Sequence, residues 1–299
     1  MQHNTLSVLQ KATAQNVRTD PFPHIVLPNA LPDALYDELA ASFPSSEMLG
    51  IDSSENNVRW NYSAHQVHDN ADLPAIWRDF IAWHSGQGFF DEIIALFGQH
   101  IQALYPDHFP DAQKLAGMRA GVRKRDKFVR CDIQMDAQIS GNTPVTETSS
   151  VRSTHVDRGD KLFSGLFYMR PADYDAVGGD LTISRFKPAF AGRPERFDLF
   201  SDAYVDDSHV EHVATIPYDS NRLVLFINSL DSLHGVTVRQ PSDKSRLFVN
   251  FIGEIQPRLY HLERKGQSAR YLPYNAHDPK LLATKMVRLF NGMRRRLVG

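Results

Sequence analysis

The stretch from Val129 to Ile139 constrains the fold more than any other part of the chain, because apolar and polar side chains alternate along it. The apolar positions are Val129, Cys131, Ile133, Met135, Ala137 and Ile139. Strict period two is typical of a β-strand with one buried face. Shorter strand-like runs follow at 162–169, 180–184, 213–217, 222–228, 235–239 and 246–253. No helical pattern separates these runs, so the sequence predicts an antiparallel sandwich or jelly roll rather than a parallel α/β sheet.

The chain before residue 128 has a different pattern. Apolar side chains recur there at helical spacing, in three groups: Leu35, Leu39 and Phe43; Ile76, Trp77, Phe80 and Trp83; and several positions from Phe89 to Leu104. We therefore predict a mainly β protein with flanking helices (α+β). A mostly helical N-terminal region, residues 1–127, would pack on a β core at residues 128–256.

The C-terminal extension, residues 257–299, contains a predicted amphipathic helix that begins near Pro279. Its apolar positions include Leu282, Met286 and Leu289, and no acidic residue follows Asp278. The simpler interpretation is a helix docked on the sheet with a solvated basic face. The alternative is peripheral contact with a membrane surface or an anionic partner.

Two long segments inside the β region are expected to be loops. Residues 141–153 are rich in Thr and Ser and are predicted to be mobile, and residues 185–211 read as irregular. Long loops on a β scaffold often shape a substrate pocket. The polar positions Asp132, Gln134, Asp136 and Gln138 fit two interpretations equally, a pocket lining or a solvated face.

Composition narrows the class of partner and the compartment. Lys and Arg total 33 against 35 for Asp and Glu, and the formal charge of -2 makes a nucleic-acid partner unexpected. The single cysteine, Cys131, excludes an intrachain disulfide and fits a reducing compartment. We expect a cytoplasmic protein, because we find no signal-peptide pattern and no run of about 18 apolar residues. The sequence does not indicate an oligomeric state.

The candidate chemistry lies in three residues, His155, Asp157 and His234. In an extended chain, residues i and i+2 point to the same side, so His155 and Asp157 can present an imidazole and a carboxylate to one point. His234 follows the apolar run 222–228 after a short polar turn, and it is the candidate third ligand. Two imidazoles and one carboxylate form the facial triad of non-haem Fe(II) oxygenases, which leaves coordination positions open for a cosubstrate and O₂.

A basic residue further along the chain is the candidate anchor for a carboxylate. Arg246 begins the run 246–253, and its planar guanidinium can hold a carboxylate bidentately. Arg239 is a rival for this role because it lies closer to His234 in the sequence. We favour Arg246.

These elements together resemble the Fe(II)- and 2-oxoglutarate-dependent dioxygenases, in the prolyl-hydroxylase-like branch. The resemblance runs from about Phe128 to Gly253. Its motifs stand here as THVD at 154–157, LFSGLFYM at 162–169, GGDLTIS at 178–184, NRLVLFINS at 221–229, HGV at 234–236 and SRLFVNF at 245–251.

The resemblance implies a double-stranded β-helix (jelly-roll, cupin-like) core and a set of roles. His155, Asp157 and His234 would hold iron, and Arg246 would bind the C5 carboxylate of 2-oxoglutarate with help from Tyr168. The interval between His234 and Arg246 is longer than is usual in the family. Asp157 keeps the carboxylate that halogenases of this superfamily lack, so hydroxylation or a related oxidation is implied.

The expected function is Fe(II)- and 2-oxoglutarate-dependent hydroxylation of an unactivated C–H bond, with O₂ consumed and succinate and CO₂ released. A small molecule or biosynthetic precursor is the favoured substrate, and a protein side chain such as proline is the alternative. Two other hypotheses are a non-catalytic metal-binding jelly roll that senses a ligand, and a cupin-like enzyme that uses no 2-oxoglutarate. Arg246 argues against the cupin-like enzyme, which does not need it.

Overall fold

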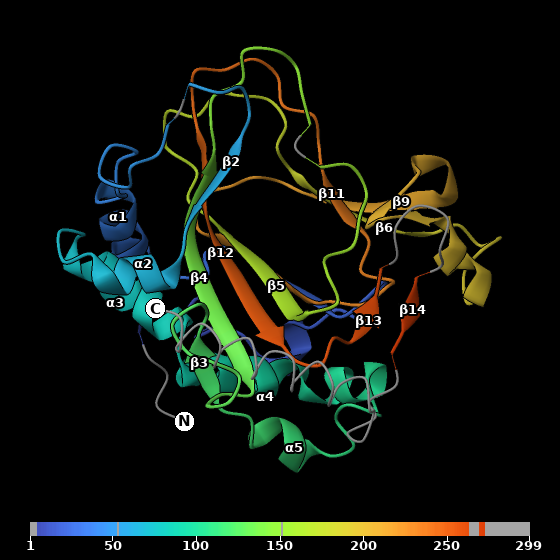
Figure 1. Ribbon diagram of the computed structural model, residues 1–299. Helices are drawn as coiled ribbons and strands as arrows, with labels where there is room; N and C mark the ends of the chain where they lie inside the picture. Colours follow the sequence, from blue (N-terminus) through green and yellow to red (C-terminus); the bar gives the residue numbers. More distant parts are fainter. Residues whose placement is uncertain (1–4, 53, 151, 263–268, 273–299) are drawn as a thin grey trace, which may run out of the picture.

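Two β-sheets face each other in the computed structural model, which describes residues 5–52, 54–150, 152–262 and 269–272 (Figure 1). The larger sheet has seven strands. Their order is β1 (His24–Leu27), β10 (Arg222–Ile227), β5 (Lys161–Tyr168), β12 (Arg246–Ile255), β4 (Ile133–Asn142) and β2 (Arg59–Tyr62), with β3 (Ala120–Val122) parallel to β4. All other neighbours in this sheet are antiparallel, as the series of short strands predicts.

The smaller sheet contains β11 (His234–Val236), β6 (Leu181–Phe186) and β9 (Val210–Ile216). Beside β11 the chain between β4 and β5 runs antiparallel, with bridges from Val145 to Ser242, Ser149 to Arg239 and His155 to His234. The described part of the segment expected to be a mobile loop, 141–153, therefore pairs through isolated bridges with the chain that follows β11.

The region 185–211, expected to be irregular, contains short elements of its own. They are η2 (Pro194–Leu199), β7 (Phe200–Ser201), β8 (Tyr204–Val205) and η3 (Asp207–His209). A further pair, β13 (Tyr260–His261) and β14 (Arg270–Tyr271), follows the end of the larger sheet.

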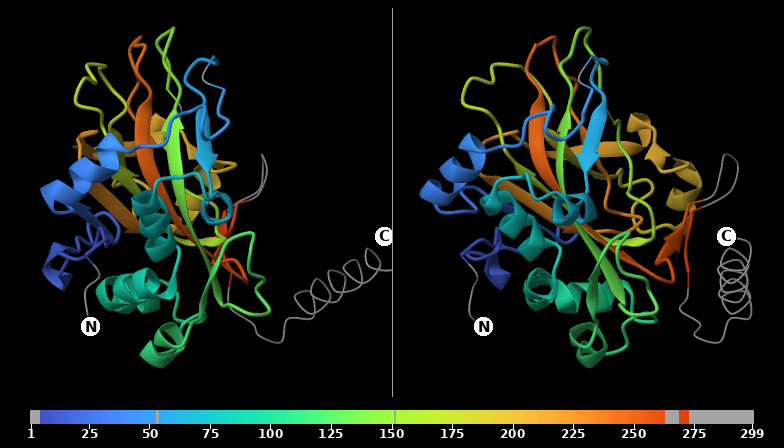
Figure 2. Two further views of the ribbon diagram at one scale, coloured as in Figure 1. Left: turned by 90° about the vertical axis from the view of Figure 1, so that its left-hand side faces the viewer. Right: turned by 60° about the vertical axis from the view of Figure 1, so that its left-hand side comes forward.

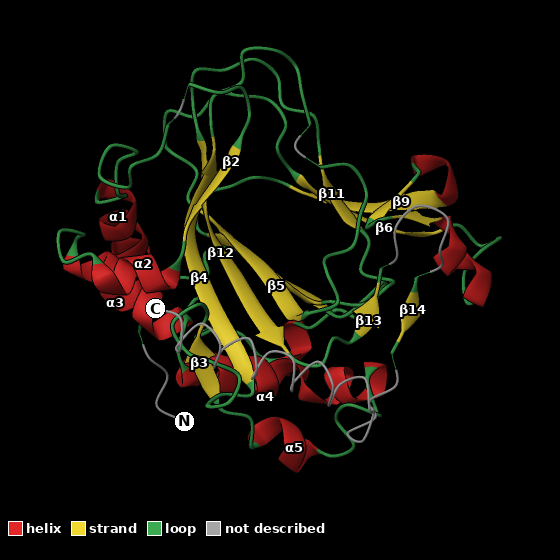
Figure 3. Ribbon diagram, in the orientation of Figure 1, coloured by secondary structure: helices red, strands yellow, loops and turns green. Residues whose placement is uncertain are grey.

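The α-helices pack against the face of the larger sheet that points away from the smaller sheet (Figures 2 and 3). They are α1 (Asp33–Ala41), α2 (Ala64–Asp69), α3 (Ala75–His84), α4 (Gln87–Leu104) and α5 (Ala112–Ala116), and a short η1 (Ala14–Asn16) precedes β1. Trp77, Phe80 and Phe89 are fully buried at this contact. Burial of such aromatic side chains is the main source of stability for a helix layer of this kind.

The strand register divides β4 into two buried faces. Ile133, Met135, Ala137 and Ile139 belong to the apolar cluster beneath the helices. Asp136, Gln138, Ser140 and Asn142 alternate with them and are also buried, so they face the space between the two sheets. Of the four polar positions with two possible interpretations, Asp136 and Gln138 are therefore buried, Gln134 is half-buried, and the Asp132 side chain is 39% exposed.

The first part of the predicted strand was wrong. Val129 is 79% exposed in a turn, and the strand begins only at Ile133. The turn around residues 124–130 brings β4 back beside β3, so the alternation before Ile133 does not reflect a sheet face.

The chain is mainly β, with a jelly-roll-like pair of sheets. The N-terminal 127 residues are more than a helical layer, because they supply β1, β2 and β3 to the larger sheet. The predicted C-terminal helix lies outside the described residues. Within the described part of the chain, no helix is long and apolar enough to cross a membrane.

Candidate metal centre

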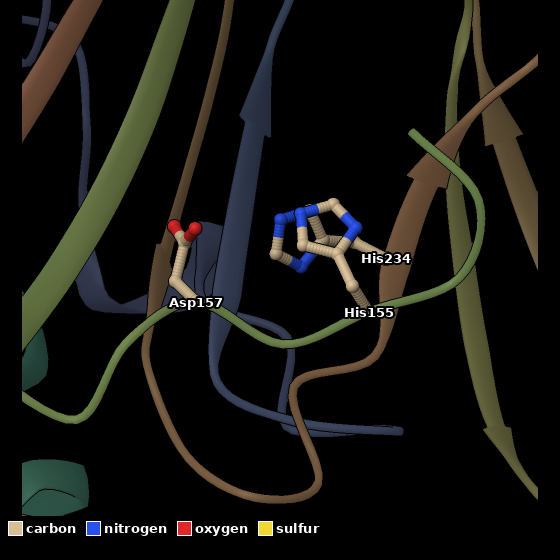
Figure 4. Close-up of side chains that lie close together, drawn as sticks. All are labelled: His155, Asp157 and His234. Atoms are coloured by element: carbon tan, nitrogen blue, oxygen red, sulfur yellow. The ribbon is translucent and has the colours of Figure 1, made fainter. Parts of the chain in front are cut away.

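The structure brings His155, Asp157 and His234 together at one end of the space between the sheets (Figure 4). One ligand atom from each residue lies within 4.8 Å of the others, and all three residues are buried. His155 and Asp157 lie on the extended segment before β5, and His234 is the first residue of β11. Among the described residues this is the one group of three or more His, Cys, Asp or Glu side chains that could hold a metal ion.

Backbone carbonyls orient both imidazoles. The Nδ1 atom of His155 lies 2.8 Å from the carbonyl oxygen of Ser153, and Nδ1 of His234 lies 2.9 Å from that of Ser232. A carbonyl oxygen can only accept, so each Nδ1 carries the proton and donates it. Each Nε2 is then unprotonated and can act as an acceptor, which is the tautomer that a metal-binding histidine needs.

The Asp157 carboxylate is held by two side chains of β5. Ser164 donates its hydroxyl to Oδ2 at 2.6 Å, and Nζ of Lys161 lies 3.2 Å from the same oxygen. Burial raises the pKa of Asp157, but the Lys161 ammonium and the Ser164 hydrogen bond help to hold it well below its usual range. The carboxylate is therefore ionised at neutral pH.

Both imidazoles are neutral at the same pH. Burial, with a smaller contribution from the nearby His234, lowers the pKa of His155 to about 3 against the attraction of Asp157. Burial also lowers the pKa of His234. Two neutral imidazoles and one ionised carboxylate are the protonation states that a divalent transition metal requires of its ligands.

A guanidinium group approaches the same point. Arg152 donates Nη1 to Nε2 of His155 at 2.9 Å, and this nitrogen lies 3.5 Å from Oδ1 of Asp157. A cation shared between an imidazole lone pair and a carboxylate stands in for a metal cation at this position. The donor set therefore fits a divalent metal in two respects. Its atoms are of the types that such a metal binds, and the site already attracts a positively charged group.

Arg246 lies on β12 inside the same space and has few partners. It is 3% exposed, and its Nε and Nη2 atoms have no hydrogen-bond partner among the described residues. Its guanidinium carbon lies 5.0 Å from the ring centroid of Tyr168, 4.7 Å from that of Tyr218 and 5.0 Å from that of Phe248. A buried guanidinium with unpaired donors costs free energy, so this arrangement calls for an anionic ligand.

Tyr168 lies beside Arg246 with its hydroxyl unpaired among the described residues. It is fully buried, and its register partner Phe248 places it on the inner face of the sheet. Its neighbour Tyr218 differs, because the Tyr218 hydroxyl donates to the carbonyl of Leu247 at 2.9 Å and accepts from the Leu247 N–H at 2.8 Å. An unpaired hydroxyl beside an unpaired guanidinium forms a donor pair that a carboxylate could bridge.

Arg239, the rival for the carboxylate, is also fully buried but is used by the protein itself. Its Nη1 donates to Oδ1 of Asn57 at 2.7 Å and to the carbonyl of Thr143 at 3.0 Å, and its Nη2 donates to the carbonyl of Lys244 at 3.1 Å. These bonds tie three separate loops together. Among the described residues Arg239 keeps one donor without a partner, Nε, whereas Arg246 keeps two, Nε and Nη2.

Sequence reasoning missed the residues that support the site. Ser164 and Lys161 lie inside the predicted strand at 162–169 or next to it, where the period of two places Ser164 on the same face as Tyr168. That pattern could have identified Ser164. Arg152 and Tyr218 gave no comparable signal, because they lie in irregular segments whose path depends on the tertiary fold.

Comparison with known proteins finds matches only among solved structures. No family model matches the chain, and no curated protein matches it. A prolyl-4-hydroxylase from Pseudomonas putida matches with 12% identity and a TM-score of 0.41, over 78% of this chain and 92% of that one. Prolyl 4-hydroxylase from Phytophthora capsici matches with 11% identity and a TM-score of 0.45, over 86% and 67%.

HygX from Streptomyces hygroscopicus, solved with nickel and 2-oxoglutarate bound, matches with 11% identity and a TM-score of 0.39, over 85% of this chain and 92% of that one. Matches at this level carry no residue roles across to this chain. The assignments below rest on the geometry of its own side chains.

Proposed function

We propose that the protein is an Fe(II)- and 2-oxoglutarate-dependent dioxygenase that hydroxylates an unactivated C–H bond of a small molecule. One observation carries the proposal: a buried His155–Asp157–His234 cluster shares an interior with the buried guanidinium of Arg246, whose Nε and Nη2 have no partner among the described residues. The cluster has the donor set of a facial triad, and Arg246 has the chemistry to hold a carboxylate.

In this proposal Nε2 of His155, Nε2 of His234 and the Asp157 carboxylate hold the iron. The chemistry supplied by iron and 2-oxoglutarate when bound is O₂ activation and C–H oxidation, with succinate and CO₂ as the other products. Ser164 and Lys161 fix the carboxylate, and the carbonyls of Ser153 and Ser232 fix the imidazoles. Ligands held in this way need little rearrangement when metal binds.

Arg246 and Tyr168 hold the distal carboxylate of 2-oxoglutarate. The Arg246 fork offers two unpaired donors, and the Tyr168 hydroxyl offers another. Tyr218 and Phe248 cover the guanidinium and keep water from it, which strengthens the charge-assisted hydrogen bonds at this end.

A small molecule fits the interior position of the site, because the polar side chains of β4 lie between the two sheets and not on an outer surface. Hydroxylation of a protein side chain is the alternative. The cytoplasmic location is likewise a proposal, supported by the lone, buried thiol of Cys131. The membrane-contact alternative for the C-terminal helix stays a prediction.

The proposal is tested by conversion of 2-oxoglutarate to succinate in air with Fe(II). We expect slow, iron-dependent succinate formation by the wild-type protein, and none by Asp157→Ala or His234→Ala. His212→Ala is the matched control, because His212 is exposed on β9 and outside the cluster. Metal binding without any succinate would favour the non-catalytic sensor, and equal turnover in all variants would contradict the triad.

A further inference from the structure

We propose that the substrate carries an anionic group, a carboxylate or a phosphate, and that Arg59 binds it beside the metal centre. This inference rests on the proposed function and specifies the substrate class for that site. Arg59 is the first residue of β2, the edge strand of the larger sheet next to β4.

The register of three strands places Arg59 on the inner face of the sheet. Arg59 pairs with Asn142 on β4, and Asn142 pairs with Arg246 on β12. Register partners in an antiparallel sheet point to the same side, so the three form one row of N–H donors across the sheet. Arg246, at one end of this row, is assigned to 2-oxoglutarate, which leaves Arg59 at the other end without an assigned role.

The contacts of Arg59 confirm this direction. Its guanidinium carbon lies 5.1 Å from the ring centroid of Phe248, and Arg246 lies 5.0 Å from the same ring. Its Nε donates to Oδ1 of Asn61 at 3.2 Å. Among the described residues Arg59 forms no ion pair.

Charged side chains at the metal centre affect the pKa of Arg59. Desolvation lowers its pKa to about 10, Asp157 opposes that shift, and Arg152 and Arg246 add to it. Arg59 is exposed to solvent and stays charged at neutral pH. It is therefore accessible to a ligand from solution and within electrostatic reach of Asp157, Arg152 and Arg246.

The site has more basic than acidic groups. Arg152 and Lys161 both pair with Asp157, and Asp157 is also the acidic group with the strongest influence on Arg59. Two basic side chains thus share one carboxylate, and among the described residues Arg59 has no acidic partner of its own. The charges of Fe(II) and of the 2-oxoglutarate dianion cancel, so their binding leaves the excess positive charge for a further anion.

A second observation points to a ligand rich in acceptors. Asn142 is 3% exposed, and its Nδ2 has no hydrogen-bond partner among the described residues. It lies in the row between Arg59 and Arg246. A buried amide N–H₂ without an acceptor is costly unless a ligand supplies one. An anion bound by Arg59 would bring oxygen acceptors to this part of the row.

The test uses calorimetric titration of the full-length protein loaded with Fe(II) and saturating 2-oxoglutarate without oxygen. The probes are phenyl phosphate, benzoate and the uncharged benzyl alcohol. Wild type is compared with Arg59→Gln, Arg59→Lys and the control Arg78→Gln, which changes an exposed arginine on α3. The visible band of the iron–2-oxoglutarate chelate is recorded in each sample first.

We expect phenyl phosphate, benzoate or both to bind wild type and Arg78→Gln at least about tenfold more tightly than benzyl alcohol, as charge-assisted hydrogen bonds predict. Arg59→Gln should abolish this preference, and Arg59→Lys should keep part of it. The tighter anion identifies phosphate or carboxylate as the preferred group.

Wild-type protein without a preference for anions, or a preference that survives in Arg59→Gln, would overturn the inference. A missing chelate band in wild type counts against the proposed function instead. In that event the same titration of the protein alone decides the role of Arg59 by the same criteria.

Discussion

His155 and His234 are joined by a reciprocal pair of backbone hydrogen bonds. The N–H of His155 donates to the carbonyl of His234 at 2.8 Å, and the N–H of His234 donates to the carbonyl of His155 at 2.9 Å. Their ring centroids lie 4.3 Å apart as a result. Two segments distant in sequence thus present two imidazoles side by side, and one nitrogen of each ring lies within 4.8 Å of a carboxylate oxygen of Asp157.

Removal of the Ser164 hydroxyl tests the support of the Asp157 carboxylate. Ser164→Ala loses the 2.6 Å hydrogen bond to Oδ2 without changing a metal ligand. We expect metal affinity to fall about 10- to 100-fold. Metal titration of the variant measures this. Ser140→Ala, which removes a hydroxyl from the same inner face but bonds to Asn61, should leave metal affinity unchanged.

Substitution of Arg246 should weaken the binding of 2-oxoglutarate, whereas substitution of Arg239 should lower the free energy of unfolding. Arg246→Ala removes the unpaired guanidinium, and we expect the Kd for 2-oxoglutarate to rise about 100-fold with metal binding retained. Arg239→Ala leaves Asn57 and two carbonyls without their donor, so we expect a loss of about 3 kcal/mol in the free energy of unfolding.

Calorimetry and urea denaturation of both variants distinguish these outcomes. An unchanged Kd in Arg246→Ala, with a raised Kd in Arg239→Ala, would reverse the assignment of the two arginines. Arg246→Lys should restore binding in part, because an ammonium keeps the charge but loses the bidentate fork.

Phe substitutions at Tyr168 and Tyr218 allow the same comparison between 2-oxoglutarate affinity and stability. The Tyr168 hydroxyl has no partner among the described residues, so Tyr168→Phe should keep its stability and bind 2-oxoglutarate up to about tenfold more weakly. Tyr218→Phe loses two bonds to Leu247, and its free energy of unfolding should fall by about 1–2 kcal/mol. A loss of stability in Tyr168→Phe without any change in 2-oxoglutarate affinity would make Tyr168 an ordinary core residue.

His84 makes stability depend on pH at a position far from the metal ligands in the sequence. Burial lowers its pKa to about 3 in the folded protein, where Nδ1 donates to the Phe80 carbonyl at 2.7 Å and Nε2 accepts from the N–H of Val8 at 3.1 Å. The unfolded chain binds a proton at pH values up to about 6.5. Because the unfolded state holds more protons between these values, stability is fully present above pH 6.5 and falls as the pH is lowered toward 3.

The measurement is chemical denaturation at pH 7.5 and pH 5.5. The His84 term alone should cost about 1.4 kcal/mol between these two values. His84→Gln should be less stable at pH 7.5 but should lose about that much less on acidification than wild type does. An equal pH dependence in both proteins would show that His84 is not the titrating group.

Local patterns predicted much of the β core. Alternation located β4 from Ile133 onward, and β5, β10 and β12 fall close to the predicted runs. The error at Val129 arose because a turn followed by a strand can imitate period two over a few residues. The three short strands before residue 128 were missed, because β1, β2 and β3 gain their stability from β10 and β4, which lie far away in sequence.

The candidate site was predicted as far as residue order allows. The HxD spacing and the position of His234 after a strand selected the three residues that the structure brings together. Their supporting contacts depend on tertiary placement. Nothing in the sequence shows that both Nη atoms of Arg239 bond to Asn57 and two carbonyls, while Nε and Nη2 of Arg246 have no partner among the described residues.

An anaerobic titration of metal-free protein with Fe(II) and then 2-oxoglutarate, followed by visible absorption, tests whether the metal centre binds both. The proposed function predicts a metal-to-ligand charge-transfer band that saturates with 2-oxoglutarate and is absent in Asp157→Ala. Iron binding without this band would mean that 2-oxoglutarate does not chelate the metal. That result would contradict the assignment and favour a metal-binding sensor or a cupin-like enzyme.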